Sequence, residues 1–355
     1  MRTHKLVVIP GDGIGPEQTE VTLGVLQAVQ KRAGNFQLDI ETHEAGAGQY
    51  RKSGKAMTDE TLAACKAAAG VIKGPVGHPD VRLPDGTEAG TLGGVLRPGL
   101  DAYANLRPVR LYPGVASAIG AKPGSIDYLI VRENTEGLYA SRGRGFVTNE
   151  LAIDNMVLTR KGCERVSRKA FELARTRAGA PKDKAKRVTL VDKANVLRGF
   201  YFFRQIFLEV AKGYPEIQAE CLYADATAAK LVQDPGHFDV LVMENFLGDI
   251  LSDLGAGTVG GLGMCPSGNI GDGTAYFEPI HGSAPDIAGQ DRANPLSMVL
   301  SAAMMLDWLN EPAAASRVRE AVDACLADGA IKLLPNGSVV EGTKAAGKAL
   351  VQRIG

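Results

Sequence analysis

Short runs of apolar residues alternate with longer amphipathic stretches along the whole chain. Runs this short and continuous are typical of strands buried on both faces of a parallel or mixed sheet. They cover Leu6–Ile9, Gly70–Lys73, Tyr128–Val131, Val188–Val191 and Phe238–Met243. The stretches between and after them predict helices over residues 15–32, 58–69, 160–178, 195–212, 225–233, 245–254, 294–310 and 313–327. This alternation predicts an α/β fold.

Local signals refine this pattern at two places. Asn294 followed by Pro295 predicts a helix with Asn294 as its N-cap and the proline in the first helical position. Residues 140–150 are rich in Gly and Arg without apolar periodicity, so they predict a loop or a projecting arm. No stretch of about 18 apolar residues occurs, and no membrane-spanning helix is expected.

Composition narrows the class of protein. The 355 residues are enough for two domains, and 45% hydrophobic with 23% charged residues is usual for a folded globular chain. Forty basic residues balance forty acidic ones, so no basic field is present for nucleic acid. The five cysteines never form a C-x-x-C pair, and the apolar run at the N-terminus stops at Gly11. A reducing compartment, the cytoplasm, is therefore expected.

A glycine-rich turn follows the first predicted strand, in the sequence Pro10-Gly-Asp-Gly-Ile-Gly-Pro-Glu17. The dinucleotide-binding fingerprint of the Rossmann fold requires glycine at the first, third and sixth positions of such a turn. Here the sixth position is Pro16, so an ordinary Rossmann site is not expected. The simpler interpretation is a strand-to-helix turn with proline in the first helical position.

Asp249 and Asp253 lie four residues apart, on one face of a predicted helix, where like charges repel. A hard divalent cation would offset that repulsion, and Asp225 could supply a third oxygen. Carboxylates without nearby His or Cys fit Mg²⁺ or Mn²⁺ better than zinc. A solvated acidic helix face explains the same spacing, and the spacing alone does not separate the two.

Four basic residues lie in or beside apolar segments of the sequence. Arg97, Arg107 and Arg132 lie in or next to apolar segments, where a guanidinium needs an anion such as a substrate carboxylate or a neighbouring acidic residue. Lys193 follows a predicted strand, at the carboxyl end where α/β proteins place active-site residues. A surface lysine at a strand end is the alternative interpretation.

Six segments, taken in order, resemble the isocitrate and 3-isopropylmalate dehydrogenase family, the β-decarboxylating dehydrogenases, along essentially the whole chain. They are Pro10–Glu17, Tyr103–Pro108, Arg132–Tyr139, Asp192–Val196, Glu244–Asp253 and Phe277–Gly289. The resemblance implies a mixed sheet in a non-Rossmann fold of two domains. It assigns residues 1–102 and 257–355 to a large domain with an adenosine-binding loop, and residues 103–256 to a small domain with a dimer interface and an arm at about 140–160. It also implies a homodimer with shared active sites, and a higher oligomer stays open.

The resemblance implies roles for the basic residues and one tyrosine. Arg97, Arg107 and Arg132 would hold the carboxylates of a small hydroxy-acid substrate. Lys193, reaching across the dimer, would take part in deprotonating the 2-hydroxyl group. Tyr139 would protonate the carbon that loses CO₂.

The resemblance also implies the metal and the cofactor. Asp249 and Asp253 would bind Mg²⁺ or Mn²⁺ together with Asp225 of the other subunit. A carboxylate at Asp286 would repel the 2′-phosphate of NADP, and relatives that use NADP carry lysine and tyrosine at this position and the next, so Asp286-Ile287 favours NAD. The residues expected around the cofactor are His281, Gly282, Ser283, Ala284, Pro285, Asp286, Ile287 and Asn294.

The expected activity is NAD-dependent oxidative decarboxylation of a 3-substituted (R)-malate of the isocitrate, homoisocitrate or 3-isopropylmalate class. Gly93 and Gly94 precede the first substrate arginine and provide neither an apolar wall nor a polar contact for the substituent, so tartrate and D-malate stay as alternatives. A non-catalytic regulatory subunit is an alternative of another class. It is disfavoured because all the residues expected for catalysis and metal binding are present.

Overall fold

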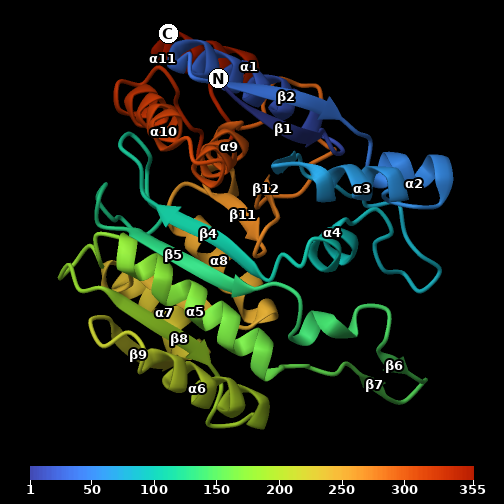
Figure 1. Cartoon of the computed structure of the whole chain (residues 1–355), viewed down its shortest axis with the longest axis vertical. Coiled ribbons are helices and arrows are strands. Elements are labelled where there is room, and N and C mark those ends of the chain that lie inside the picture. Colours follow the sequence, from blue (N-terminus) through green and yellow to red (C-terminus); the bar gives the residue numbers. More distant parts are fainter. The chain divides into compact units, whose positions relative to one another are not determined.

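The computed structural model describes residues 1–355, which divide into two compact units. Unit 1 consists of Met1–Asp101, Tyr112–Ala116 and Gly260–Gly355, so it contains both ends of the chain (Figure 1). Unit 2 consists of Ala102–Leu111 and Ser117–Val259. Each unit is built from strands covered by helices, and the predicted mixed α/β class is confirmed.

The strands of unit 1 lie side by side in the order β2-β1-β3-β12-β11. All neighbours are parallel except β11, which is antiparallel to β12. The bounds are β1 Arg2–Ile9, β2 Phe36–Thr42, β3 Gly70–Lys73, β11 Pro266–Ile270 and β12 Ala275–Pro279. The parallel strands β1, β3 and β12 therefore end at one edge of the sheet, and the glycine-rich turn starts from this edge.

Helices α1 and α9 pack close to these strands, with α10 and α11 beside them. The α9 helix is apolar over nearly its whole length, because it is buried between the sheet and other helices. The helices of unit 1 are α1 Gly15–Ala33, α2 Ala47–Ser53, α3 Asp59–Ala67, α4 Gly93–Gly99, α9 Leu296–Trp308, α10 Pro312–Ala327 and α11 Thr343–Ile354, with a 3₁₀ turn η3 at Leu262–Met264.

The strands of unit 2 lie in the order β4-β5-β10-β8-β9, with β4 antiparallel to β5 and all other pairs parallel. Their bounds are β4 Ala104–Arg110, β5 Asp127–Glu133, β8 Arg187–Asp192, β9 Gln218–Tyr223 and β10 Val240–Met243. The connections β5-α5-β8 and β8-α6-β9 run in one direction and β9-α7-β10 runs back. Right-handed crossovers therefore place α5 and α6 on one face and α7 and α8 on the other (Figure 1).

The helices of unit 2 are α5 Arg160–Thr176, α6 Arg198–Ala211, α7 Ala224–Gln233 and α8 Asn245–Thr258, with 3₁₀ turns η1 at Leu138–Ser141 and η2 at Pro235–His237. A two-stranded hairpin, β6 Phe146–Val147 with β7 Ala152–Ile153, extends from unit 2 and exposes its apolar side chains (Figure 1). The hairpin lies within the arm expected at about 140–160, although β7 lies beyond the stretch 140–150 that was predicted from composition.

Two details of helix starts differ from the expectation. The N-cap of α9 is Pro295 rather than Asn294, although the Asn294 side chain still accepts a hydrogen bond from the Leu296 amide at 3.0 Å. In α1 the first helical residue is Gly15, so Pro16 stands second. Both shifts are a single residue, because the proline's fixed φ fits a position on either side of the helix boundary.

Candidate active site

Several strand ends meet at one edge of the unit 2 sheet. Arg132 on β5 is in register with Met243 on β10, which is in register with Val191 on β8. Antiparallel pairing brings Asn105 of β4 beside Arg132. The predicted residues Arg132 and Lys193 and the start of α8 therefore lie along this edge, where ligands bind in open α/β sheets.

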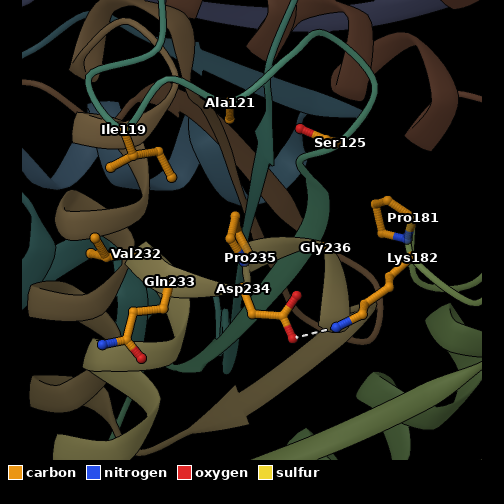
Figure 2. A pocket seen from close by; sticks show the side chains of 10 residues that line it. All are labelled: Ile119, Ala121, Ser125, Pro181, Lys182, Val232, Gln233, Asp234, Pro235 and Gly236. Carbon is orange, nitrogen blue, oxygen red and sulfur yellow. Dashed lines mark hydrogen bonds and ion pairs between the residues drawn. The ribbon is translucent and has the colours of Figure 1, made fainter.

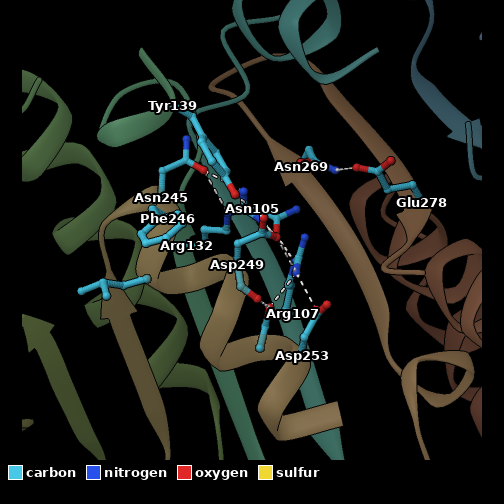
Figure 3. Close-up of polar contacts among 12 residues, drawn as sticks. Asn105, Arg107, Arg132, Tyr139, Asn245, Phe246, Asp249, Asp253, Asn269 and Glu278 are labelled. Carbon is cyan, nitrogen blue, oxygen red and sulfur yellow. Dashed lines mark hydrogen bonds and ion pairs between the residues drawn. The ribbon is translucent and has the colours of Figure 1, made fainter. Parts of the chain in front are cut away.

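The Arg132 side chain is only 1% exposed and makes directed contacts in this unit. Its Nε and Nη2 atoms both donate to Asn245 Oδ1, at 3.0 and 2.8 Å, and Nη1 donates to Asp249 Oδ1 (Figure 3). Asn245 in turn donates to the Glu136 carbonyl at 3.0 Å. A Cβ atom on Gly248 would come within 2.5 Å of Arg132 Cγ, so the glycine provides the space for this side chain.

Arg107 approaches the same helix from β4. Its Nε donates to Asn105 Oδ1 at 2.7 Å, and Nη1 donates to Ser252 Oγ at 2.6 Å. The same Nη1 atom is 3.4 Å from Oδ1 of both Asp249 and Asp253. The acidic face of α8 is thus not simply solvated. Two arginines that were predicted to bind a substrate face the carboxylates that were predicted to bind a metal.

Tyr139 completes this group of side chains. Its hydroxyl donates to Asp249 Oδ2 at 2.8 Å, and its ring packs edge-to-face on Phe246. The pKa of the Tyr139 phenol is raised, mainly by partial burial and secondly by the hydrogen bond to the Asp249 carboxylate. The phenol therefore holds its proton throughout the neutral pH range.

Electrostatics around α8 favour a cation. Burial, together with the charge of Asp249, raises the pKa of Asp253, although Arg107 opposes the shift. A hard divalent ion would compensate two carboxylates one helical turn apart, and oxygen is the ligand type it prefers. Within one chain no group of three or more His, Cys, Asp or Glu residues is arranged to hold a metal. Two of the three predicted ligands are thus close together here and the third is not.

Lys193 and Asp225 form a separate pair. Lys193 Nζ lies 2.7 Å from Asp225 Oδ1, and this hydrogen bond lowers the pKa of the Asp225 carboxyl. The ammonium also lies 5.8 Å from the centre of the Tyr223 ring. Asp225 is largely exposed, in the first turn of α7. The lysine and the carboxylate are therefore presented together toward solvent.

The glycine-rich turn lies at the edge of the unit 1 sheet, where close backbone contacts require glycine. Gly11 and Gly13 both have positive φ, and a Cβ atom on them would come within 2.1 Å of the Pro75 carbonyl oxygen and 2.0 Å of the Ser283 carbonyl oxygen, respectively. The Ile14 amide donates to that Ser283 oxygen at 2.8 Å. Gly11 allows close backbone packing against the loop after β3, and Gly13 allows it against the loop after β12. This is a structural role unlike that of a Rossmann turn.

The predicted cofactor loop lies wholly within unit 1, between β12 and α9. Ser283 is buried and donates to the Gly77 carbonyl at 2.6 Å, whereas Asp286 is exposed. On β12, before the loop, Glu278 pairs with Lys73 at 2.7 Å. Glu278 also accepts a hydrogen bond from Asn269 at 3.0 Å (Figure 3). Arg97, the third predicted substrate residue, also belongs to unit 1 and is half-buried on α4.

The sequence did not single out several residues that organise these sites. Asn245 and Gly248 hold Arg132, Glu244 caps α8, and Gln18 contacts both ends of the cofactor loop. The available signal was a polar residue or glycine inside an apolar helical stretch. That signal indicates a contact without identifying the partner.

A surface pocket of about 430 Å³ in unit 2 is lined by none of the predicted site residues (Figure 2). Lys182 and Asp234 form an ion pair of 2.9 Å at its rim. The chemistry-bearing side chains are concentrated at the sheet edges instead. No helix is both long and apolar enough to cross a membrane.

Comparison with known proteins agrees with this arrangement. Residues 5–336 match the model of the isocitrate/isopropylmalate dehydrogenase family. The chain is 40% identical to a 3-isopropylmalate dehydrogenase of Thermosynechococcus vestitus, over 99% of both chains. It is 44% identical to a 3-isopropylmalate/3-methylmalate dehydrogenase of Methanocaldococcus jannaschii, over 92% of each. The crystal structure of an isocitrate dehydrogenase from Methylococcus capsulatus superposes with a TM-score of 0.86 at 39% identity, over 99% of both chains.

A match to the family model over nearly the whole chain, with relatives at this level of identity, also identifies the protein as a dehydrogenase that decarboxylates a hydroxy acid. The chain belongs to the isocitrate/isopropylmalate dehydrogenase family.

Proposed function

We propose that this protein catalyses the NAD-dependent oxidative decarboxylation of a 3-substituted (R)-malate, with Mg²⁺ or Mn²⁺. The observation that carries the proposal is the convergence of Arg107, Arg132 and Tyr139 on Asp249. It joins two anion-binding groups, a proton donor and a carboxylate face in one unit. Relatives named for 3-isopropylmalate and 3-methylmalate support the substrate class.

The two arginines bind the carboxylates of the substrate. Without substrate their guanidinium groups face Asp249, which has the same chemistry as a substrate carboxylate. A substrate carboxylate would take this place at the arginines, and Asp249 together with Asp253 would then be available to hold the cation. Asn245 keeps the Arg132 guanidinium in one plane, so little side-chain entropy is lost on binding.

The cofactor and the cation, when bound, supply an electron acceptor for the oxidation and a Lewis acid for the decarboxylation. The side chains of the protein carry out the proton transfers. Lys193 takes part in deprotonating the 2-hydroxyl group, and its contact with Asp225 orients the side-chain nitrogen. Tyr139, kept protonated by burial and by Asp249, delivers a proton to the carbon that loses CO₂.

The proposed metal site needs a second chain. Asp249 and Asp253 supply two oxygens, and no third acidic residue joins them within the chain. A homodimer in which Asp225 and Lys193 serve the partner's site resolves this shortage. The exposed apolar hairpin β6–β7 supports association, because such side chains are costly to leave in water.

NAD is the proposed cofactor because the exposed Asp286 carboxylate would repel a 2′-phosphate. We also place the enzyme in a reducing compartment, the cytoplasm. This proposal is supported by the five cysteines, none of which forms a disulfide bond within the chain and four of which are buried.

The test is a substrate panel of isocitrate, homoisocitrate, 3-isopropylmalate, D-malate and tartrate, with NADH absorbance and released CO₂ measured together. One 3-substituted malate should give NADH and CO₂ in equal amounts, and EDTA should abolish both. NAD should be preferred over NADP by about a hundredfold in kcat/KM. NADH without CO₂, or full activity in EDTA, would contradict the proposed reaction. No turnover of any substrate by the metal-loaded protein would favour a regulatory subunit.

A further inference from the structure

Gln18, on the first turns of α1, is 0% exposed and reaches both ends of the cofactor loop. Its Nε2 atom donates to the Asn294 carbonyl at 2.8 Å and lies 3.2 Å from His281 Nε2. Ile280 alone separates His281 from the end of β12, and Pro295 alone separates Asn294 from the start of α9. One amide group therefore contacts the His281 ring and the Asn294 backbone carbonyl, at the two ends of the loop.

The orientation of this amide follows from its partners. The Asn294 carbonyl only accepts hydrogen bonds, so the nitrogen of the Gln18 amide must face it. His281 Nδ1 lies 2.9 Å from the Gly282 carbonyl and must carry a proton there. His281 Nε2 is then the acceptor, and the Gln18 amide supplies its hydrogen. Burial lowers the pKa of His281, which agrees with a neutral ring.

Burial of the Gln18 amide also has an energetic cost, which an apolar side chain at this position would not have. Gln18 Oε1 is buried without a hydrogen-bond partner. An apolar side chain of the same size would fill this position without an unsatisfied acceptor. The amide is thus retained at a cost, which is expected where a residue is needed for its hydrogen bonds.

We propose that Gln18 is a positioning residue for the cofactor: it ties His281 and Asn294 together and so sets the geometry of residues 281–294 before NAD binds. The inference rests on the proposed role of this loop in binding the adenosine half of NAD. It concerns affinity for the cofactor and not the chemical step, because Gln18 and its partners all belong to unit 1 and the acid–base residues to unit 2.

The test compares Gln18→Met with Gln27→Met, the same change at an exposed position of the same helix. Binding of NADH is followed by its fluorescence and binding of ADP-ribose by calorimetry. Gln18→Met should raise both dissociation constants and the KM for NAD about tenfold and leave kcat within about twofold. Gln27→Met should change none of these quantities. Should Gln18→Met fail to fold, Gln18→Asn replaces it, because its shorter amide cannot reach both partners.

Gln18→Glu adds a readout that loss of packing would not reproduce. The introduced carboxylate raises the pKa of His281, and a protonated ring restores one of the two contacts. The KM for NAD should therefore fall as the pH is lowered from 8.5 to about 6. The other charged groups nearby are Lys73, paired with Glu278, and Glu17 with its neighbours Asp291 and Lys344. All of them are also present in Gln27→Met, which should lack this pH dependence.

The outcomes distinguish a wrong cofactor assignment from a wrong role for Gln18. If the unmodified protein binds neither NADH nor ADP-ribose, the cofactor assignment is wrong and the role of Gln18 falls with it. If the unmodified protein binds both and Gln18→Met binds them equally well, only the role of Gln18 is wrong.

Discussion

At the scale of single residues, the site depends on how Arg132 is held. A buried guanidinium is costly unless each donor has a partner, and Asn245 and Asp249 provide these partners. Gly248 is as important as the hydrogen bonds, because any side chain there would occupy the volume of the arginine. The position of Arg132 is therefore set by one amide and by one absent side chain.

Gly248→Ala tests this account. The added methyl would displace the Arg132 side chain, lower the free energy of unfolding by about 1 to 3 kcal/mol and raise the KM for the hydroxy acid at least tenfold. The matched control is Gly257→Ala on the same helix, where nothing lies within 4 Å of the added methyl. It should raise stability by about 0.5 to 1 kcal/mol with unchanged kinetics. Equal kinetics for the two variants would contradict the role of Gly248.

Asp253→Asn separates metal binding from stability. The raised pKa means that folding favours protonated Asp253, so its contribution to stability is present at low pH and is lost as the pH rises through that pKa. At neutral pH the neutral amide should raise the Tm of the metal-free protein by about 1 to 2 °C. It should weaken Mn²⁺ binding, measured by calorimetry, at least tenfold. Unchanged Mn²⁺ affinity would remove Asp253 from the metal site, and the exposed Asp272→Asn is the control.

At the scale of elements, α8 and the 3₁₀ turn η1 are joined by one carboxylate. Glu244 Oε2 accepts from the amides of Phe246 and Leu247 and caps the helix, while Oε1 accepts from the Leu138 amide at 2.7 Å. The helix that carries Asp249 and the 3₁₀ turn that carries Tyr139 are thus fixed to the same side chain. Gly137 makes room for it, since a Cβ atom there would come within 2.0 Å of Glu244 Oε1.

Glu244→Ala should therefore affect both stability and turnover. Loss of the cap should lower the free energy of unfolding by about 1 to 2 kcal/mol. Loss of the contact to Leu138 should lower kcat at least tenfold, because Tyr139 is no longer held beside Asp249. Thr58→Ala removes the cap of α3 in unit 1 and is the matched control. It should show the same loss of stability in urea denaturation with normal kcat, whereas normal kcat in Glu244→Ala would refute the coupling.

At the scale of the whole molecule, the proposed site is divided between chains. Arg107, Arg132, Tyr139, Asp249 and Asp253 form one group, while Lys193 and Asp225 pair with each other. If the second group serves the partner's site, an active dimer needs one intact group from each subunit. A closed twofold dimer would then contain two such sites.

Complementation between inactive variants tests the shared site. Lys193→Met and Asp253→Asn should each be nearly inactive alone. Random assembly of an equal mixture gives half mixed dimers, and each of them has one intact site of two, so about a quarter of the unmodified activity should return. Mixing is done by co-expression with two affinity tags. If purified mixed dimers stay inactive, Lys193 serves its own chain or the site is not shared.

Much of the fold could be predicted from local pattern, whereas the roles of the site residues follow from the resemblance and stay predictions. The buried strands β1, β3, β5, β8 and β10 were found because continuous apolar runs identify strands covered on both faces. The strands β2 and β9 were missed because edge strands alternate polar and apolar residues and leave part of their length exposed. The interior strands β4, β11 and β12 were also missed, because Asn, Arg, Pro, Gly or Glu residues interrupt their apolar runs. The short helices α2 and α4 contain too few apolar residues to give a period.

The sequence by itself determined which residue types are available and which of them are neighbours within an element. Asp249 and Asp253 share a face because the helical repeat puts residues four apart together, whatever the rest of the chain does. Only the tertiary structure decided that Arg107, Arg132 and Tyr139 meet Asp249, and that Gln18 reaches His281 and Asn294. Those contacts join elements up to about 280 residues apart, and sheet register and helix packing, rather than any local period, bring them within hydrogen-bond distance.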